Sequence, residues 1–506
     1  MLALENVRVI DLTEALAGPY CTMILGDLGA DVVKVERPIV GDQSRKWGPP
    51  FIGTESAYFL SVNRNKRSVE LDIKSADGKV AMRNLLETAD VFICNVRKLE
   101  SLIEVGLDPE TVRAYNPRLI YCSITAYGRT GPYADRAGYD LVAQGESGLM
   151  AATGQIDGEP MRWPVAIADL SSGIWSANAI LTALYVRERT GCGQLIDQSL
   201  LDGQLSWAAV MAGQYFATGE RPARLGNRHA NIVPYQVFKA SDKYLIVAVG
   251  TPVQWRRFCD SLDLGEAIRD DLRYADNAAR LKNREQLCDI IQSVLVSNTA
   301  EYWLARLRLA EIPAGPVNTL DEALADPQVL HRNMVVKLEH PSGELKVLGN
   351  PLHFSDTKVA YRRRPPLLGE HTTELLEQLV DRSHTSYTLP AGIPLTAVDW
   401  RLPRYVSQLP VRFGSVRLNA PATTINLSDG GCAVRFTGQS PRVGDEVTLS
   451  VCQDEQSAET RAIVRWVRET NSVEKTVGLE VVRNDVELRT WRALIATVAR
   501  SGARAA

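Results

Sequence analysis

The stretch "VAIADLSSGIWSA", residues 165–177, holds a single carboxylate, Asp169, among small, hydroxylic and apolar residues. No basic residue lies within it to form an ion pair. Two roles suit this acid. Asp is preferred just before the first turn of a helix, and near the free backbone N–H groups of a helix start it stays charged, with an oxygen available as a nucleophile. The stretch therefore predicts a helix cap, a catalytic nucleophile, or both.

An apolar stripe at helical spacing follows Asp169, formed by Ile174, Ala177, Leu181 and Leu184. The sequence "RERTG" then supplies basic residues and a glycine, which are typical of a helix end. We expect one long helix that begins beside Asp169.

The composition bounds the class of protein. A chain of 506 residues predicts two to four domains. Its net charge of −3 does not favour nucleic acid or an anionic membrane as a partner. The eight Cys are scattered, the six His all lie at position 229 or later without metal-ligand spacing, and no signal peptide or membrane span is evident. We expect a cytoplasmic protein without a metal.

The first 125 residues alternate between strands and helices. "VRVIDL", "DVVKVE", "SVELDI", "DVFICNV" and "PRLIYCSIT" have the character of strands, and helical stretches separate them. This alternation predicts an α/β fold with a Rossmann-like parallel sheet covered by helices.

The residue pattern changes at three points along the chain, which indicates domain boundaries. We expect a large α/β domain over residues 1–225, completed by about 335–380, and a smaller α+β domain over 226–334 that begins with antiparallel strands in "YQVFKASDKYLIVAVG". Residues 381–397 form a linker rich in Ser, Thr and Pro. Short β-like runs over 398–506 predict a small all-β barrel.

Polar or flexible residues follow three of the strands, at the edge where open α/β sheets bind ligands. They are Arg37, then Asn95 with Arg97, then Gly128 with Gly131. The stretch "NRNKRSVELDI" adds Arg64, Lys66 and Arg67. Such basic groups together suit a ligand with several phosphates, although for each one taken alone a solvated charged surface is the favoured interpretation.

Several nucleotide and hydrolase signatures are absent. The turn after the first strand, "TEALAGPYC", has no GxGxxG, and the chain has neither GxxxxGK[ST] nor GxSxG. These absences disfavour a dinucleotide enzyme, a P-loop ATPase and an α/β-hydrolase.

Six motifs together resemble the class III CoA-transferases (CaiB/BaiF family). They are "DLTEALAGPYCTMILGDLGADVVKVERP", "NRNKRSVELDIK", "DVFICNV", "GRTGPYADRAGYD", "IADLSSGIWSANAILTALYVRERTGCGQ" and "PLLGEHT". They occur in order over roughly residues 3–377, and Asp169 falls on the family's nucleophilic aspartate. The resemblance implies that Asp169 attacks an acyl-CoA thioester, forming an aspartyl anhydride and then an aspartyl-CoA thioester. No tightly bound cofactor is required.

The resemblance also assigns binding residues. Arg37 is expected to contact a CoA phosphate, and Gly128 and Tyr139 to lie on the substrate side. The other positions carried over for CoA are Leu16, Ala17, Leu71, Ile73, Lys74, Asn95 and Arg97. Members of the family form interlocked rings, which implies a homodimer.

Four features depart from patterns seen in the family or its subgroups. Leu16 stands where a polar residue is frequent, and "NVRKLESLIEVG" places Glu104 near a position where many members have Arg. Tyr139 stands where racemases of this family have the His that exchanges the α-proton, so a racemase is the weaker alternative. "GNRHANIVPYQ" lacks the glycine-rich loop of formyl-CoA transferases, so oxalate is not the expected acceptor.

The C-terminal region resembles a PilZ domain, a receptor module for cyclic di-GMP. Asn426, Ser428 and Gly431 match its [D/N]xSxxG motif, and Arg404 matches the second arginine of RxxxR. The first arginine position holds Trp400, with Arg401 one place later. Arginines bind guanine edges and phosphates through forked hydrogen bonds, so the displacement weighs against tight binding.

Three functions therefore remain open. The preferred one is a CoA-transferase that uses acyl-CoA and carboxylic acid substrates and carries a tail responsive to cyclic di-GMP. The alternatives are an acyl-CoA racemase or isomerase on the same scaffold, and an inactive scaffold that senses the second messenger.

Overall fold

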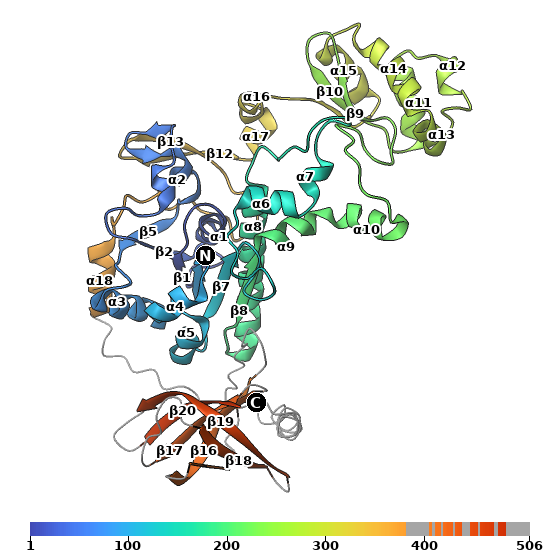
Figure 1. The fold of residues 1–506 in the computed structure, drawn as a ribbon. Coiled ribbons are helices and arrows are strands. Elements are labelled where there is room, and N and C mark those ends of the chain that lie inside the picture. Colours follow the sequence, from blue (N-terminus) through green and yellow to red (C-terminus); the bar gives the residue numbers. More distant parts are fainter. Residues whose placement is uncertain are drawn as a thin grey trace.

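The computed structural model describes residues 1–380 and, beyond them, the backbone pairing of seven strands between Arg404 and Val481. The N-terminal body is built on a six-stranded sheet in the order β5-β2-β1-β6-β7-β8, with every neighbouring pair parallel (Figure 1). Its strands are β1 (Arg8–Leu12), β2 (Asp31–Glu36), β5 (Lys66–Glu70), β6 (Val91–Cys94), β7 (Ile120–Thr125) and β8 (Leu195–Ser199). This confirms the predicted parallel α/β fold. The third strand begins and ends earlier than "SVELDI".

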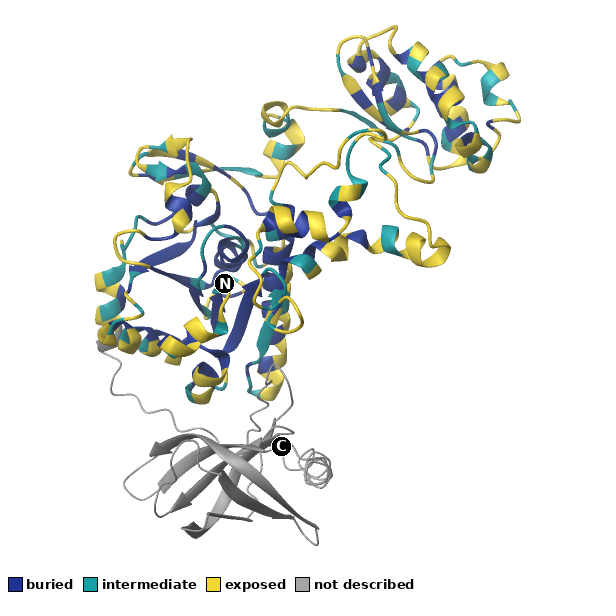
Figure 2. Cartoon of the chain, viewed as in Figure 1, coloured by how far each residue is buried: buried dark blue, intermediate teal, exposed yellow. Residues whose placement is uncertain are grey.

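Both faces of this sheet are covered, so its strands are apolar on both sides. Val9 packs into a core with α1 (Ala17–Asp27) and α8 (Ile167–Thr190), whereas the next residue, Ile10, packs into a core on the other face. That second face is covered by α3 (Ala76–Glu87), α4 (Leu99–Val105), α5 (Pro109–Tyr115) and α18 (Thr372–Val380). Figure 2 shows the sheet buried between these helices.

The chain order places a topological switch at the centre of the sheet. From β1 the chain goes outward to β2 and β5, and it then returns to β6 on the other side of β1. In open α/β sheets, ligands bind in the crevice beyond the carboxyl ends of the strands at such a point. The fold thus places a site beyond the ends of β1 and β6.

Shorter elements complete the N-terminal body. They are the 3₁₀ helices η1 (Gln43–Lys46) and η2 (Ser206–Ala208), the hairpin β3 (Phe51–Ile52) and β4 (Glu55–Ser56), and the helices α2 (Ala57–Val62), α6 (Asp140–Glu146), α7 (Leu149–Ala152), α9 (Leu200–Leu205) and α10 (Ala209–Thr218). The last of them, α10, extends away from the body (Figure 1).

A second core is built by residues 233–312. As "YQVFKASDKYLIVAVG" predicted, β9 (Tyr235–Lys239) and β10 (Tyr244–Ala248) pair in antiparallel fashion, and β11 (Ala314–Pro316) joins β10. The helices of this unit are α11 (Pro252–Ser261), α12 (Glu266–Arg269), α13 (Asn277–Lys282), α14 (Arg284–Leu295) and α15 (Ala300–Leu309). Figure 1 shows the unit set apart from the parallel sheet.

The chain then returns to the N-terminal body. It passes through α16 (Leu320–Leu324), α17 (Pro327–His331) and the hairpin β12 (Val335–His340) and β13 (Gly343–Leu348). Leu345 and Val347 of the hairpin pack on Leu60, and Leu375 of α18 joins the core beneath the sheet. Among the described residues, no helix is long and apolar enough to cross a membrane.

The C-terminal strands form one antiparallel sheet in the order β14-β16-β15-β18-β19-β20-β17. They are β14 (Arg404–Val406), β15 (Pro410–Ser415), β16 (Leu418–Ser428), β17 (Gly431–Thr437), β18 (Glu446–Gln453), β19 (Gln456–Glu469) and β20 (Glu474–Val481). Because β16 also pairs with β17, the sheet closes on itself as a barrel, as predicted.

Candidate active site

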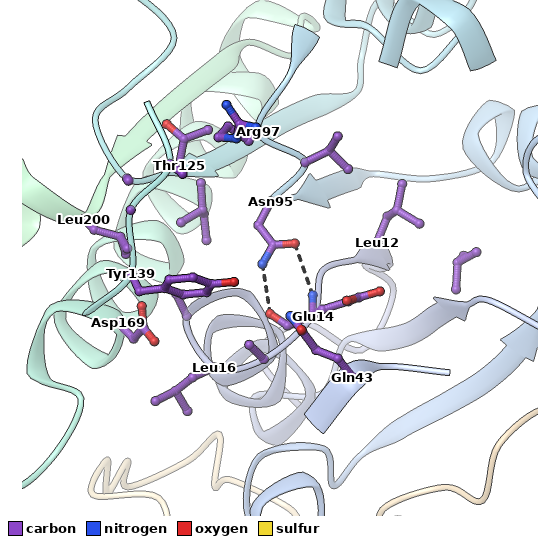
Figure 3. Close-up of a pocket in the computed structure, with 18 of the residues that line it drawn as sticks. Leu12, Glu14, Leu16, Gln43, Asn95, Arg97, Thr125, Tyr139, Asp169 and Leu200 are labelled. Atoms are coloured by element: carbon purple, nitrogen blue, oxygen red, sulfur yellow. Dashed lines mark hydrogen bonds between the residues drawn. The ribbon is translucent and has the colours of Figure 1, made fainter. Parts of the chain in front are cut away.

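A cavity of about 460 Å³ lies beyond the carboxyl ends of the parallel strands. Its lining comes from the segments that follow β1, β2, β5, β6 and β7, and from the starts of α8 and α9. In Figure 3, Asp169 lies on one side of the cavity and Asn95, Glu14 and Gln43 on the other, with Tyr139 between them in this view.

Most of the predicted site residues line this cavity. They are Leu16, Ala17, Arg37, Leu71, Ile73, Asn95, Arg97, Tyr139 and Asp169. Two predicted residues lie outside the lining. Lys74 is exposed, and its backbone amide donates to the Asp72 carboxylate. The backbone N–H of Gly128 donates to the Thr125 hydroxyl at 2.9 Å, and a Cβ at this position would lie 3.3 Å from the Asp197 carboxylate.

Asn95 fastens the loop after β1 to the end of β6. Its Oδ1 accepts from the backbone N–H of Glu14 at 3.2 Å, and its Nδ2 donates to the backbone carbonyl of Glu14 at 2.9 Å (Figure 3). The next amide, that of Ala15, donates to the buried Asp42 carboxylate at 3.2 Å. The loop that leads into α1 is therefore held from two sides.

Asp169 is the third residue of α8, not its cap. The N-cap position is held by Ala166, and no side chain caps the helix from there, so the capping prediction is wrong. The sequence pattern could not fix the start of the helix to within a residue or two. The predicted end is correct: Gly191 terminates α8 in the left-handed conformation.

The Asp169 carboxylate has no hydrogen bond or ion pair among the described residues. Burial, which disfavours the charged form, raises its pKa from 3.8 to about 7, and the nearby Asp140 carboxylate acts in the same direction. Poorly solvated carboxylates are more basic and hold less water, and both properties favour nucleophilic attack.

The sequence reasoning missed Asp140. Its Oδ1 accepts from the Ala168 amide at 2.8 Å, and its Oδ2 accepts from Gln144 at 2.7 Å. Asp140 thus satisfies a free N–H in the first turn of α8 from outside the helix. The motif "AGYD" contained it, but only the fold places it beside Asp169.

Close packing of α8 on α1 brings Asp169 to the cavity. A Cβ on Gly173 would lie 2.7 Å from the Ala17 carbonyl oxygen and 3.1 Å from the Tyr20 ring. Only glycine permits this approach. The predicted apolar stripe holds for Ala177 and Leu184, but Ile174 is exposed.

The basic residues before the third strand do not line this cavity. Arg64, Lys66 and Arg67 are buried, and their charges pair with Asp27, Asp11 and Asp31, respectively. The fold turns these side chains toward acids, of which Asp27 and Asp11 are buried and Asp31 is partly exposed, and the local sequence could not reveal this.

Other lining residues were also missed. They are Glu14, Ala15, Gln43, Val96, Thr125, Ala126, Ala137, Gly138 and Leu200. Five of them, Glu14, Ala15, Val96, Ala126 and Leu200, lie within three residues after the end of a strand, and that position is the signal that could have found them. Among the described residues, no group of His, Cys, Asp and Glu could hold a metal ion.

In the C-terminal barrel, the strand register brings two predicted motifs together. Arg404 of β14 is opposite Ser428 of β16, and Val406 is opposite Asn426. Gly431, at the start of β17, also pairs with Ser428. Arg401 lies outside the described residues.

Comparisons with known proteins agree with this architecture. Residues 4–372 match the model of CoA-transferase family III, and residues 400–498 match the PilZ domain. Succinyl-CoA:glutarate CoA-transferase of Mus musculus is 43% identical over 381 residues, covering 75% of this chain and 87% of the relative. Succinyl-CoA:mesaconate CoA-transferase of Haloarcula hispanica is 39% identical, covering 75% of this chain and 96% of the relative.

A solved structure is similar as well. A CaiB/BaiF family protein from Brucella suis has a TM-score of 0.68 and 43% identity, covering 74% of this chain and 98% of its own.

Proposed function

Because this chain belongs to CoA-transferase family III and carries a C-terminal PilZ domain, we propose that it moves CoA from an acyl-CoA donor to a free carboxylic acid through covalent intermediates on Asp169. The observation that carries the proposal is the unpaired, largely buried carboxylate of Asp169 facing a cavity at the switch point of the sheet.

The chemistry begins at the donor thioester. An Asp169 oxygen attacks the thioester carbonyl, the C–S bond breaks, and CoA leaves as a thiolate, which gives a mixed anhydride. The thiolate then attacks the aspartyl carbonyl, and the donor acid leaves as a carboxylate. Asp169 now holds CoA as a thioester.

The second half repeats these steps in reverse. The acceptor carboxylate attacks the aspartyl thioester, forming a new anhydride and releasing thiolate. The thiolate takes the acceptor acyl group, and Asp169 returns as a free carboxylate. Overall, one thioester and one carboxylate are exchanged for another thioester and another carboxylate, so the net reaction is close to balanced. The mixed anhydrides are its reactive intermediates, and the protein has mainly to hold the reactants close and exclude water.

The residues at the strand ends suit the CoA part of the substrate. Arg37 offers a guanidinium to a phosphate, and Arg97 lines the same cavity. Asn95 supports the loop between CoA and Asp169 through Glu14. Tyr139 lines the cavity at the position where racemases of this family have a His, and the absence of that base favours transfer over racemisation.

Short dicarboxylic acids are the proposed acid class. The relatives' names pair succinyl-CoA with glutarate and with mesaconate, and each relative is covered over most of its length. We take succinyl-CoA and glutarate as the first pair to assay.

Trapping the intermediate tests this mechanism. After incubation with succinyl-CoA, hydroxylamine should convert Asp169 into a hydroxamate, and borohydride should reduce its thioester, both visible as peptide mass shifts. Asp169→Asn should bind CoA, give no mark and lose at least about a thousandfold in turnover. A mark on another residue, or turnover by the variant, would refute the role. Uptake of deuterium from solvent at the α-carbon without transfer would indicate an isomerase.

A second copy of the chain is the proposed partner of helix α10. None of its residues is buried, and Val210 and Phe216 are 77% and 81% exposed. Trp207 and Ile174 nearby are also exposed. An apolar helix with no buried face requires another surface to cover it, and a homodimer supplies one.

Cyclic di-GMP is the proposed ligand of the PilZ domain. The backbone pairing of Arg404 with Ser428 puts the two PilZ-like motifs on neighbouring strands. A guanidinium can bind a guanine edge or a phosphate. The displaced first arginine, Arg401, predicts weaker binding than a regular RxxxR pair would give.

A further inference from the structure

The side chain of Glu14 is an acid inside a cavity that must receive a ligand with several negative charges. It lines the cavity with Arg37, and the two form an ion pair in which Arg37 Nη2 lies 2.9 Å from Glu14 Oε1. Arg37 is the residue to which the proposed function assigns a CoA phosphate. In the free protein, the Glu14 carboxylate is therefore paired with the guanidinium that would bind the CoA phosphate.

The other two acids that line the cavity, Glu36 and Asp169, each have another role. Glu36 forms a buried pair with Arg45 at 2.8 Å, and Asp169 is the proposed nucleophile. The Glu14 carboxylate, by contrast, is not paired with a buried cation, and the proposed reaction gives it no role. Its pair with Arg37 is half exposed, with the two side chains 58% and 32% accessible, so it can open at low cost.

The carboxylate is not needed to shape its own loop. Asn95 holds both backbone groups of Glu14, and Asp42 holds the amide of Ala15. Replacement of the Glu14 side chain should therefore leave the loop in place. This separates a role in ligand binding from a structural one.

From this geometry we infer that Glu14 is an internal competitor for the CoA phosphate: it pairs with Arg37 in the free enzyme and is displaced when a CoA thioester binds. The competition lowers the affinity for CoA and eases its release. The inference rests on the proposed function, because it requires Arg37 to bind CoA.

Displacement of Glu14 from Arg37 should also change the protonation of Glu14. Burial and the nearby Asp42 raise the pKa of Glu14, whereas Arg37 and, more weakly, Lys34 lower it. Losing Arg37 to a phosphate removes the larger of the two lowering influences and adds a negative neighbour. The pKa of Glu14 then rises further, and CoA binding takes up protons at mildly acid pH.

Isothermal titration of the full-length protein with CoA tests the inference. Glu14→Gln should bind CoA roughly two- to fivefold more tightly than wild type at pH 7, the range expected for one partly exposed ion pair. Glu87→Gln is the matched control, since it also removes one negative charge and one exposed pair, with Arg83, away from the cavity. That variant should bind CoA like wild type.

Two further measurements separate competition from simple repulsion. In an Arg37→Gln background, Glu14→Gln should gain clearly less affinity, because no guanidinium is left to release. Titrations in buffers of different ionisation enthalpy should show proton uptake in wild type beyond that in Glu14→Gln, which corrects for titration of the CoA phosphates.

The outcomes are distinct. Equal or weaker CoA binding by Glu14→Gln, or an equal gain with and without Arg37, would overturn the inference while wild type still binds CoA. A wild-type protein that binds no CoA would refute the proposed function itself.

Discussion

The Asp140 carboxylate accepts a 2.8 Å hydrogen bond from the backbone amide of Ala168, the residue immediately before Asp169. This bond fixes the first turn of α8 and places a second negative charge near the nucleophile. Asp140 therefore both positions Asp169 and helps to raise its pKa.

Activity should depend on pH through Asp169. Because the pKa of Asp169 is raised to about 7 and only the carboxylate attacks, kcat/KM should fall about tenfold per unit as the pH drops below 7, and level off above it. Asp140→Asn should move the midpoint below 7, because a like charge is removed while the Asn oxygen can still accept from Ala168. Initial rates at pH 5 to 9 test this. An unchanged midpoint would contradict the coupling.

The contribution of Asp169 to folding stability should depend on pH in the opposite direction from activity. A carboxyl whose pKa is raised on folding favours the folded state most at low pH, and this contribution is lost as the pH rises toward about 7. Above that pH, ionised Asp169 costs stability, and Asp169→Asn should increase the free energy of unfolding by on the order of 2 kcal/mol. Denaturant unfolding at pH 5 and pH 8 measures it. The exposed Asp157→Asn is the control and should change little at either pH. A gain independent of pH would contradict the assignment.

Gly173→Ala should destabilise the body. Its Cβ would lie 2.7 Å from the Ala17 carbonyl, so α1 and α8 must separate, at a cost of about 1–3 kcal/mol. Thermal unfolding and kcat report the effect together, because α8 carries Asp169. Gly145→Ala in α6 is the matched control, with nothing within 4 Å of the added Cβ, and should be neutral or slightly stabilising. Equal effects of the two substitutions would rule out the packing argument.

Phe216→Asp should weaken self-association. The substitution places a charge on the exposed apolar face of α10, and a buried, unpaired charge in an interface costs several kcal/mol. Sedimentation velocity over a range of concentrations should give dimers for wild type and monomers for the variant. Monomeric wild type would rule out the second copy as the partner of α10.

Arg404→Ala should weaken cyclic di-GMP binding by about tenfold or more, since the arginine that the PilZ resemblance assigns to the ligand is removed. Calorimetry on the full-length chain measures the affinity. Arg412→Ala, on β15 and outside the motif, is the control and should bind like wild type. Wild type without measurable binding would leave the PilZ domain without this ligand.

The sequence by itself determined the alternation that makes a parallel sheet, the antiparallel start of the smaller unit, the barrel-like tail and the isolated acid at Asp169. Each of these follows from periodicity, turn residues or the charges of near neighbours in the chain. The exact start of α8 did not, because a first turn is defined by backbone bonds and not by one capping side chain.

Tertiary structure alone decided which charges meet. From the sequence, Arg64, Lys66 and Arg67 could be ligand contacts or surface charges, but the fold buries them and pairs them with acids distant in the chain. The same holds for Asp140 beside Asp169 and for Glu14 against Arg37. Coulomb interactions and desolvation depend on distance and burial in space, and the local sequence specifies neither.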